Sequence, residues 1–277
     1  MINFFHTFNP QSVAVQFGWL SIYWYGIFIV LGIVVGLIIV LKLARRTGVD
    51  SAEVYNLSFY LIIFSIVGAR IYAVFLNLPF YLANPFEIVA VWHGGLAIHG
   101  AIIGGVLTLL VYVFRKKQNF WVLADIFAPA VALGQAIGRW GNYFNQEVFG
   151  RPTDLPWGIP IELRNRPLEF LNFQYFHPTF LYESFLNLIN FFVLLFLFSR
   201  LAGKNRKSEI REKRVGLIFL IYLVNYSLIR IVMEFFRIDA TPLVFGVRLP
   251  IIVSGAVIVL SLVISYIKKS LGLKQRD

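Results

Sequence analysis

Long apolar segments dominate the hydrophobic pattern of this chain. Seven stretches are long enough to cross a hydrocarbon core, which takes about 20 residues. They cover residues 19–41, 57–76, 96–114, 121–139, 178–199, 215–236 and 249–267. The pattern predicts an all-α polytopic membrane protein with about seven transmembrane helices. We expect residues 1–277 to form a single transmembrane domain, in which residues 140–177, rich in Pro and aromatic residues, form a small head or loop insertion.

Composition supports a membrane protein and excludes several kinds of site. The chain is 58% hydrophobic and 14% charged, whereas a soluble domain usually carries nearly twice that charged fraction. It contains no Cys, so any reacting thiol must belong to a substrate. Its four His residues are scattered instead of paired at ligand spacing, so we expect no metal site and no cofactor.

Positive charge collects in alternate connections between the predicted spans. The segments after the first, third, fifth and seventh spans carry three, three, seven and four basic residues, 17 of the chain's 25. Lys and Arg near span ends favour the cytoplasmic side. We therefore predict an external N-terminus, a cytoplasmic C-terminus and an extracytoplasmic head. Topology and attraction to anionic lipids explain the net charge of +11, and we expect no nucleic-acid binding.

Polar side chains within the predicted spans gather in their outer halves. Charges within a membrane are costly and mark functional sites by default. Six spans contribute such residues, among them Tyr25, Arg70, His99, Arg139, Glu183 and the group Tyr226, Arg230, Glu234 and Arg237. The last four follow at steps of four, four and three, which puts them on one helical face. This asymmetry predicts a site open to the outer leaflet or the outer aqueous phase.

Most of these residues also have a purely structural interpretation. Arg230 and Glu234 have the spacing of a self-neutralising i,i+4 pair, and Arg70 is placed to snorkel to the interface. A lone histidine such as His99 is more often buried and satisfied than a base. Arg139 is harder to explain structurally, because no acid lies three or four positions away and glycines flank it. Several arginines with few acids favour an anionic ligand, and a phospholipid headgroup is the obvious phosphate in a membrane.

The end of the fourth span and the segment that follows carry a recognisable motif. The sequence GRWGNYFNQEVFG, residues 138–150, resembles the signature of the bacterial prolipoprotein diacylglyceryl transferases, roughly Gly-Arg-x-Gly-Asn-Phe-x-Asn-x-Glu-x-x-Gly. Further matches follow in the family's order along the chain: WYG (24–26), GAR (68–70), GGLAIHGAIIGG (94–105), HPTFLYE (177–183) and YSLIRIVMEFFR (226–237). Tyr143 replaces the usual Phe. His93 stands where many members have Asp, so we leave His93 out of the predicted site.

The resemblance implies an enzyme of the bacterial cytoplasmic (inner) membrane with its active site toward the outer side. The implied reaction moves the diacylglyceryl group of phosphatidylglycerol to the lipobox cysteine thiol of a prolipoprotein signal peptide, forming a thioether and releasing glycerol phosphate. It further implies seven spans and a periplasmic head.

The resemblance also implies roles for individual residues, which we take as hypotheses. Arg139 and Arg230 would bind the lipid phosphate, and His99 is the candidate base, although an arginine-lined site can also deprotonate a thiol by its field alone. Six further residues would bind or orient the substrate: Tyr25, Asn142, Glu147, Gly150, Tyr226 and Glu234.

Two other classes of membrane protein compete with this interpretation. A lipid or solute transporter usually binds its substrate near the midplane between repeated halves, and this chain has no visible repeat. An intramembrane protease needs a Ser/His or a paired Asp constellation within its spans. Asp125 is the lone Asp within the predicted spans, and no suitable Ser accompanies His99. Both alternatives are therefore less well supported than the transferase.

Overall fold

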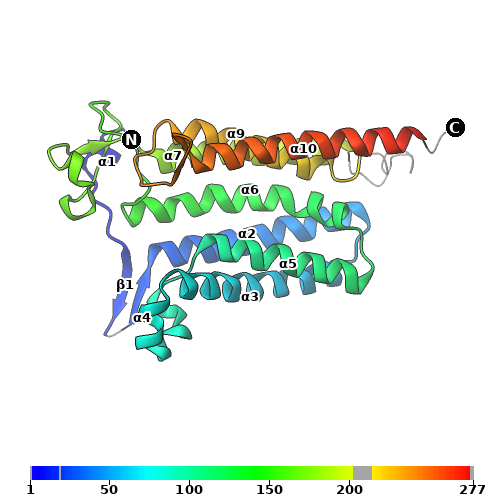
Figure 1. Ribbon diagram of the computed structural model, residues 1–277, viewed down its shortest axis with the longest axis horizontal. Coiled ribbons are helices and arrows are strands. Elements are labelled where there is room, and N and C mark those ends of the chain that lie inside the picture. The colour runs from blue at the N-terminus through cyan, green and yellow to red at the C-terminus, as the bar shows by residue number, and fades with distance from the viewer. Residues whose placement is uncertain (1, 19, 202–213, 275–277) are drawn as a thin grey trace. The chain divides into compact units, whose positions relative to one another are not determined.

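The structure is a computed structural model of the whole chain, and residues 2–18, 20–201 and 214–274 are described. Within them, seven helices are long and apolar enough to cross a membrane. They are α2 (Trp24–Thr47), α3 (Ser51–Leu76), α5 (Ile98–Lys116), α6 (Phe120–Phe144), α7 (Thr179–Leu201), α9 (Leu217–Glu234) and α10 (Leu249–Lys274) (Figure 1). The predicted all-α class with seven spans is confirmed. The orientation of the termini stays a prediction, and several of the basic residues behind it, at 204–213 and 276, lie outside the described residues.

The first span begins at Trp24, later than the predicted residue 19. Before it, strands β1 (Val13–Phe17) and β2 (Leu20–Tyr23) pair antiparallel as a hairpin. Gly18 lies in the tip of this hairpin at φ 58°, a left-handed conformation that glycine adopts without strain. The β-branched and aromatic residues of this segment favour a strand, and strand pairing satisfies their backbone groups. The hydropathy window extended the helix too far because it counts apolar residues without regard to conformation.

The fourth span extends beyond its predicted end at residue 139. Helix α6 continues to Phe144, so Arg139 and Asn142 both lie on its last turns. The head was predicted to begin at residue 140, but its irregular chain begins only at residue 145. Asn142 was predicted to lie in the head, whereas it lies in the helix; Asn145, Gln146 and Glu147 of the motif follow the helix.

The packing of its backbone divides the chain into two compact units, residues 40–124 and residues 1–39 with 125–277. In the smaller unit, α3 and α5 approach at backbone distance. A Cβ on Gly100 would overlap the carbonyl oxygen of Gly68, and a Cβ on Gly104 would overlap that of Phe64. Gly100 and Gly104, four positions apart on one face of α5, therefore permit this close helix approach. The predicted single-domain organisation stays a prediction.

In the larger unit, α9 packs against both α7 and α10 (Figure 1). Asp125 on α6 accepts hydrogen bonds from the backbone N–H groups of Gly216 (2.6 Å) and Phe219 (2.8 Å), which begin α9. Lys268 on α10 donates to the carbonyl oxygen of Val215. Asp125 therefore caps α9 from another helix and satisfies donors that would otherwise be unpaired. This accounts for the isolated acid near the predicted cytoplasmic ends of the spans.

The head has a small aromatic core of its own. Short strands β3 (Ile159–Pro160) and β4 (Tyr175–Phe176) pair in it, and short helix α1 (Ile2–Thr7) packs against it. The buried members of the core are Tyr143, Phe149, Ile159, Ile161, Phe176 and Phe180. Because α6 and α7 contribute residues to this core, the head is fixed to the ends of both helices, which carry Arg139 and Glu183.

The described chain also contains helix α4 (Leu78–Ala83), strands β5 (Leu243–Val244) and β6 (Val247–Arg248), and four short 3-10 helices. The 3-10 helices are η1 (Pro85–Ile88), η2 (Val91–His93), η3 (Leu163–Asn165) and η4 (Leu168–Phe170). Strands β5 and β6 form a tight hairpin directly before α10. This hairpin brings Arg248 back toward the end of α9.

Candidate functional site

Arg139 forms an ion pair with an acidic residue of another helix, Glu183. Its Nη2 lies 2.5 Å from Oε1 of Glu183 on α7, and the exposed fractions of the two side chains are 19% and 1%. Glu183 also lies within electrostatic reach of Arg230 and Arg237. The deeply buried Glu183 carboxylate therefore pairs with Arg139, since an unpaired charge would be very costly there.

A chain of side-chain hydrogen bonds runs from Arg139 into the turn after α6. Arg139 Nη1 donates to Asn142 Oδ1 (3.3 Å), and Asn142 Nδ2 donates to Glu147 Oε1 (2.7 Å). Asn142 is buried, whereas Glu147 is exposed. Asn142 thus fixes the position of an accessible carboxylate relative to the arginine. Tyr25 lies close enough to interact electrostatically with both Arg139 and Glu147.

The turn that carries Glu147 has a strained backbone. Gln146 and Val148 on either side of it have φ values of 51° and 58°, a left-handed conformation that is unfavourable for a β-branched residue. The Thr179 hydroxyl donates to the Val148 carbonyl oxygen, and the Gln146 side chain is held by several hydrogen bonds. Strain of this kind persists only where the surroundings over-determine it, and it clusters at functional sites.

Gly141 and Gly150 of the motif permit close contacts. A Cβ on Gly141 would lie 2.5 Å from the Tyr25 ring, and a Cβ on Gly150 would lie 2.8 Å from Cβ of His177 and 3.0 Å from the carbonyl oxygen of Phe236. Gly150 thus acts by joining the head to the chain after α9. Its backbone N–H also donates to the His177 carbonyl oxygen (3.0 Å), and its predicted role in shaping the binding pocket stays a prediction.

A second group of charges surrounds the end of α9. Arg230 and Glu234 form the i,i+4 ion pair that their spacing predicts, with exposed side-chain fractions of 16% and 0%. Arg248 approaches the same carboxylate from the β5–β6 hairpin, with its Nε 2.6 Å from Glu234 Oε2. Tyr226, one turn before Arg230, stacks on Tyr222 at 6.1 Å between ring centroids. Arg230, Glu234 and Arg248 therefore form a charged triad, in which two arginines contact the Glu234 carboxylate.

Arg237 was expected on the helical face of Tyr226, Arg230 and Glu234, and this was wrong. Helix α9 ends at Glu234, because the chain turns there toward the hairpin. Arg237 Nε instead donates to Asp239 Oδ1 at 2.6 Å. Burial alone would lower the pKa of Arg237, but the hydrogen bond and charge of Asp239 raise the pKa above its ordinary value.

This arrangement suits the binding of an anion. Four arginines, Arg139, Arg230, Arg237 and Arg248, surround three buried or half-buried carboxylates. Among the described residues, Nη1 of Arg230 is buried and has no hydrogen-bond partner. Guanidinium groups keep their charge when desolvated and bind phosphate oxygens in pairs. The unpartnered edge of Arg230 is a donor that such a ligand would satisfy.

The predicted site residues do not all fall in the same unit. Tyr25, Arg139, Asn142, Glu147, Gly150, Tyr226, Arg230 and Glu234 lie in the larger unit. His99 lies in the smaller unit, on the first turn of α5, with its ring 5.9 Å from that of Tyr72. It is exposed, so the interpretation of His99 as a buried histidine is wrong. Its role as base stays a prediction.

Arg70 has a structural role that the snorkelling interpretation did not include. Its guanidinium donates to the carbonyl oxygens of Glu87, Ile88, Ala90, Gly94 and Gly95, and its side chain is buried. These acceptors fix the irregular segment that precedes α5. Since its donors are used by backbone acceptors, Arg70 has little capacity left for a ligand. The neighbouring His93 contacts the Glu87 carboxylate at 3.0 Å on the surface.

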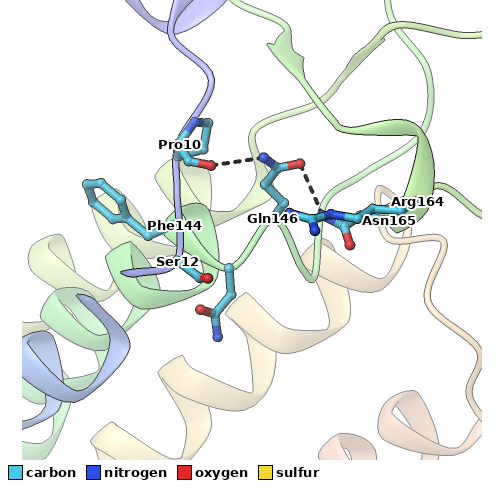
Figure 2. Close-up of a pocket in the computed structure, with 7 residues that line it drawn as sticks. Pro10, Ser12, Phe144, Gln146, Arg164 and Asn165 are labelled. Atoms are coloured by element: carbon cyan, nitrogen blue, oxygen red, sulfur yellow. Dashed lines mark hydrogen bonds between the residues drawn. The ribbon is translucent and has the colours of Figure 1, made fainter. Parts of the chain in front are cut away.

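A polar hollow of about 300 Å³ opens where the N-terminal segment meets the head (Figure 2). Gln146 forms one wall of it, donating to the Pro10 carbonyl oxygen (2.9 Å) and accepting from Asn165 Nδ2 (3.2 Å). Asn145, also in its lining, contacts Glu147 at 3.5 Å. Gln146 therefore ties three chain segments together beside the site.

Sequence reasoning missed Arg248 and Asp239, and it left Glu183 out of the predicted site as a residue that holds a neighbouring helix. The fifth span did show a lone acid at position 183, which is a signal for a partner. Spacing could not identify that partner as Arg139, because the two residues lie 44 positions apart on different helices. Arg248 and Asp239 lie in a connection between spans, where charged residues are ordinary.

Comparisons with known proteins agree with the motif. A profile described as prolipoprotein diacylglyceryl transferase matches residues 12–267. Several similar proteins bear the name phosphatidylglycerol–prolipoprotein diacylglyceryl transferase. The one from Nostoc sp. is 46% identical over 84% of this chain and 80% of its own. The one from Synechococcus elongatus is 44% identical over 84% and 78%, and the one from Prochlorococcus marinus is 40% identical over 90% and 86%. The chain therefore belongs to the prolipoprotein diacylglyceryl transferase family.

Proposed function

We propose that this protein transfers the diacylglyceryl group of phosphatidylglycerol to the lipobox cysteine of prolipoproteins, the first step of lipoprotein maturation. The observation that carries the proposal is the arginine cluster at the ends of α6 and α9, in which Arg230 keeps a buried donor without a partner. Family membership indicates the substrates, and the cluster provides the charge that a phospholipid headgroup requires.

The reaction is a substitution at a glycerol carbon of the lipid. The acceptor thiol loses its proton to a base, and its sulfur forms a bond to the carbon that carries the phosphate. The carbon–oxygen bond to phosphate breaks, its electron pair stays on the phosphate oxygen, and glycerol phosphate leaves. Because negative charge grows on the leaving phosphate, fixed donors lower the barrier.

The roles of single residues follow from this charge flow. Arg139 and Arg230 would contact the phosphate, with Glu183 and Glu234 holding their guanidinium groups in place. Glu147, exposed and fixed by Asn142, is suited to accept hydrogen bonds from the headgroup glycerol hydroxyls. Tyr25 and Tyr226 lie close to these charges and would orient them. His99 would accept the thiol proton.

We further propose that the site faces the outer side of the bacterial cytoplasmic membrane, since exported prolipoproteins present their lipobox cysteine there. The charge distribution of the sequence supports this orientation. The hydrophobic acceptor signal peptide and the lipid acyl chains would both reach the site from the bilayer.

Mass spectrometry of a lipobox peptide tests the proposal. Purified protein in vesicles with phosphatidylglycerol as the sole donor should add one diacylglyceryl mass to the peptide and release glycerol phosphate. A peptide with Ser in place of Cys should stay unmodified. An unmodified or a shortened cysteine peptide would refute the proposal.

Arg139→Ala should lower the transfer rate roughly a hundredfold, the loss typical of one preorganised donor. Arg200→Ala removes an exposed arginine at the other end of α7 and is the matched control. Thermal unfolding in detergent separates a catalytic loss from a folding defect. Activity of a folded Arg139→Ala protein near the wild-type rate would exclude a role in phosphate binding.

The pH–rate profile of His99→Gln tests the base. Loss of a general base should lower the rate and remove the acidic limb of the profile. An unchanged limb at an unchanged rate would leave deprotonation to the field of the arginines.

A further inference from the structure

Glu234 is shared by two arginines that come from different elements. Arg230 reaches one carboxylate oxygen from α9, one turn away, and Arg248 lies 2.6 Å from the other oxygen. The Glu234 side chain is fully buried, and neither of its oxygens makes an aligned hydrogen bond with any of the described residues. Two cations therefore contact this carboxylate closely, and neither is held by it in a directional hydrogen bond.

Arg248 itself is firmly placed. Its Nη1 donates to the Arg237 carbonyl oxygen (3.0 Å), and its Nη2 donates to the Asp239 carbonyl oxygen (2.8 Å). Both acceptors lie on the chain between α9 and the β5–β6 hairpin. Because these backbone bonds determine where the guanidinium lies, Arg248 offers its charge to Glu234 from a fixed position, independently of Arg230.

The charge balance gives this contact a consequence. Four arginines contact three carboxylates, those of Glu183, Glu234 and Asp239, so the cluster carries one excess positive charge with Arg248 and none without it. A carboxylate buried with a single cation holds that cation tightly, because no solvent competes. Without Arg248, Glu234 would bind Arg230 alone and draw it away from an incoming phosphate.

We propose that Arg248 is a positioning residue, which neutralises Glu234 so that Arg230 keeps its free guanidinium edge for the phosphate of the lipid. This inference rests on the proposed function. It assigns to the hairpin before α10 a part in headgroup binding that acts through Glu234, with no contact between Arg248 and the substrate.

A double-mutant cycle tests the inference. In wild-type background, Arg248→Gln should raise the KM for phosphatidylglycerol about tenfold, within the range of coupling for residues in direct contact. In a Glu234→Gln background there is no carboxylate left to capture Arg230, so the same change should raise KM less than about threefold. Arg248→Lys, which returns the charge, should recover part of the loss.

A merely structural role for Arg248 gives a different result. If Arg248 only stabilises the hairpin, Arg248→Gln should cost the same factor in both backgrounds, and that additivity would overturn the inference. So would a KM within twofold of wild type. Arg164→Gln, which removes an exposed arginine paired with Glu162, is the matched control and should leave KM unchanged.

Binding of phosphatidylglycerol, measured in nanodiscs without any peptide, separates this inference from the proposed function. Weaker binding by Arg248→Gln in the wild-type background alone supports the inference, even if no peptide is ever modified. Equal binding by the wild type and Arg248→Gln overturns it, even if transfer is observed.

Discussion

Arg70 and the arginines of the cluster differ in the acceptors that their guanidinium groups contact. Arg70 donates to five backbone carbonyl oxygens, which cannot move without breaking the segment before α5. Arg139 and Arg230 instead contact carboxylates, and Arg248 contacts the Glu234 carboxylate while also donating to two backbone carbonyl oxygens. A guanidinium that contacts a carboxylate can also bind a phosphate, because the oxygens of both anions accept its paired N–H groups. The cluster can therefore bind an anion without losing its own structure.

Asp239 gives the folded state a measurable dependence on pH. Burial alone would raise the pKa of Asp239, but the hydrogen bond and charge of Arg237 hold this pKa below its ordinary value. The resulting stabilisation is fully present above the unfolded-state pKa of about 3.9 and is lost as the pH falls through the lower folded-state pKa. Between about pH 5 and pH 3, the unfolding temperature of Asp239→Asn should therefore fall less than that of the wild type.

Unfolding of both proteins in detergent across that range measures the difference. Equal losses in the wild type and Asp239→Asn would show that the Arg237–Asp239 pair contributes nothing to the pH dependence.

At the scale of the elements, α9 depends on a residue of another helix for its N-terminal cap. Its N-terminus begins at Gly216, with φ 88°, and no side chain of its own caps it. Asp125 on α6 supplies the cap, and a negative charge there also complements the helix dipole. Further along, Asn225 on α9 donates to Asn190 on α7 at 2.9 Å. These contacts hold α9, and with it Arg230, against α6 and α7.

Loss of the Asp125 cap should destabilise the protein. Asp125→Ala leaves the N–H groups of Gly216 and Phe219 without their acceptor and should cost about 1–2 kcal/mol, the upper part of the range for a lost cap. Asp50→Ala removes the exposed cap of α3 and is the matched control, with a smaller expected loss. Thermal unfolding of both variants in one detergent gives the comparison. A larger loss for Asp50→Ala would contradict this account of α9.

The close contact between α3 and α5 leads to a second prediction about stability. Gly100→Ala would force a Cβ into the Gly68 backbone and should cost about 1–3 kcal/mol, as overpacking does. A Cβ on Gly134 of α6 meets no atom within 4 Å, so Gly134→Ala should be neutral or stabilising by up to about 1 kcal/mol. Unfolding temperatures in the opposite order would exclude the backbone contact.

At the scale of the whole molecule, orientation in the membrane decides whether the site can meet exported proteins. The chain contains no Cys, so single cysteines can be introduced without background. Asp154→Cys in the head should react with a membrane-impermeant maleimide on spheroplasts, and Lys117→Cys after α5 should react only after lysis. Both positions are exposed. The reverse pattern would place the head in the cytoplasm and refute the proposed function.

The number of spans, the class of the protein and most residues of the arginine cluster could be predicted from the sequence. Hydropathy is a sum over neighbouring residues, and a span needs nothing except enough apolar side chains in a row, so the sequence alone determines it. The motif around Arg139 identified the family for the same reason, since its residues are contiguous. Strand β2 shows where hydropathy is misleading. Its residues are apolar enough for a helix, but they pair with β1 instead.

Only the tertiary structure decided which charges meet. Glu183 pairs with Arg139, Arg248 shares Glu234 with Arg230, and Asp125 caps a helix more than 90 residues away. The energy of each contact depends on burial and on distances set by helix packing, and residue spacing along one helix carries no information on either. Arg70 is the converse case, since its sequence context resembles that of a site residue and only its five carbonyl acceptors reveal that it holds a loop.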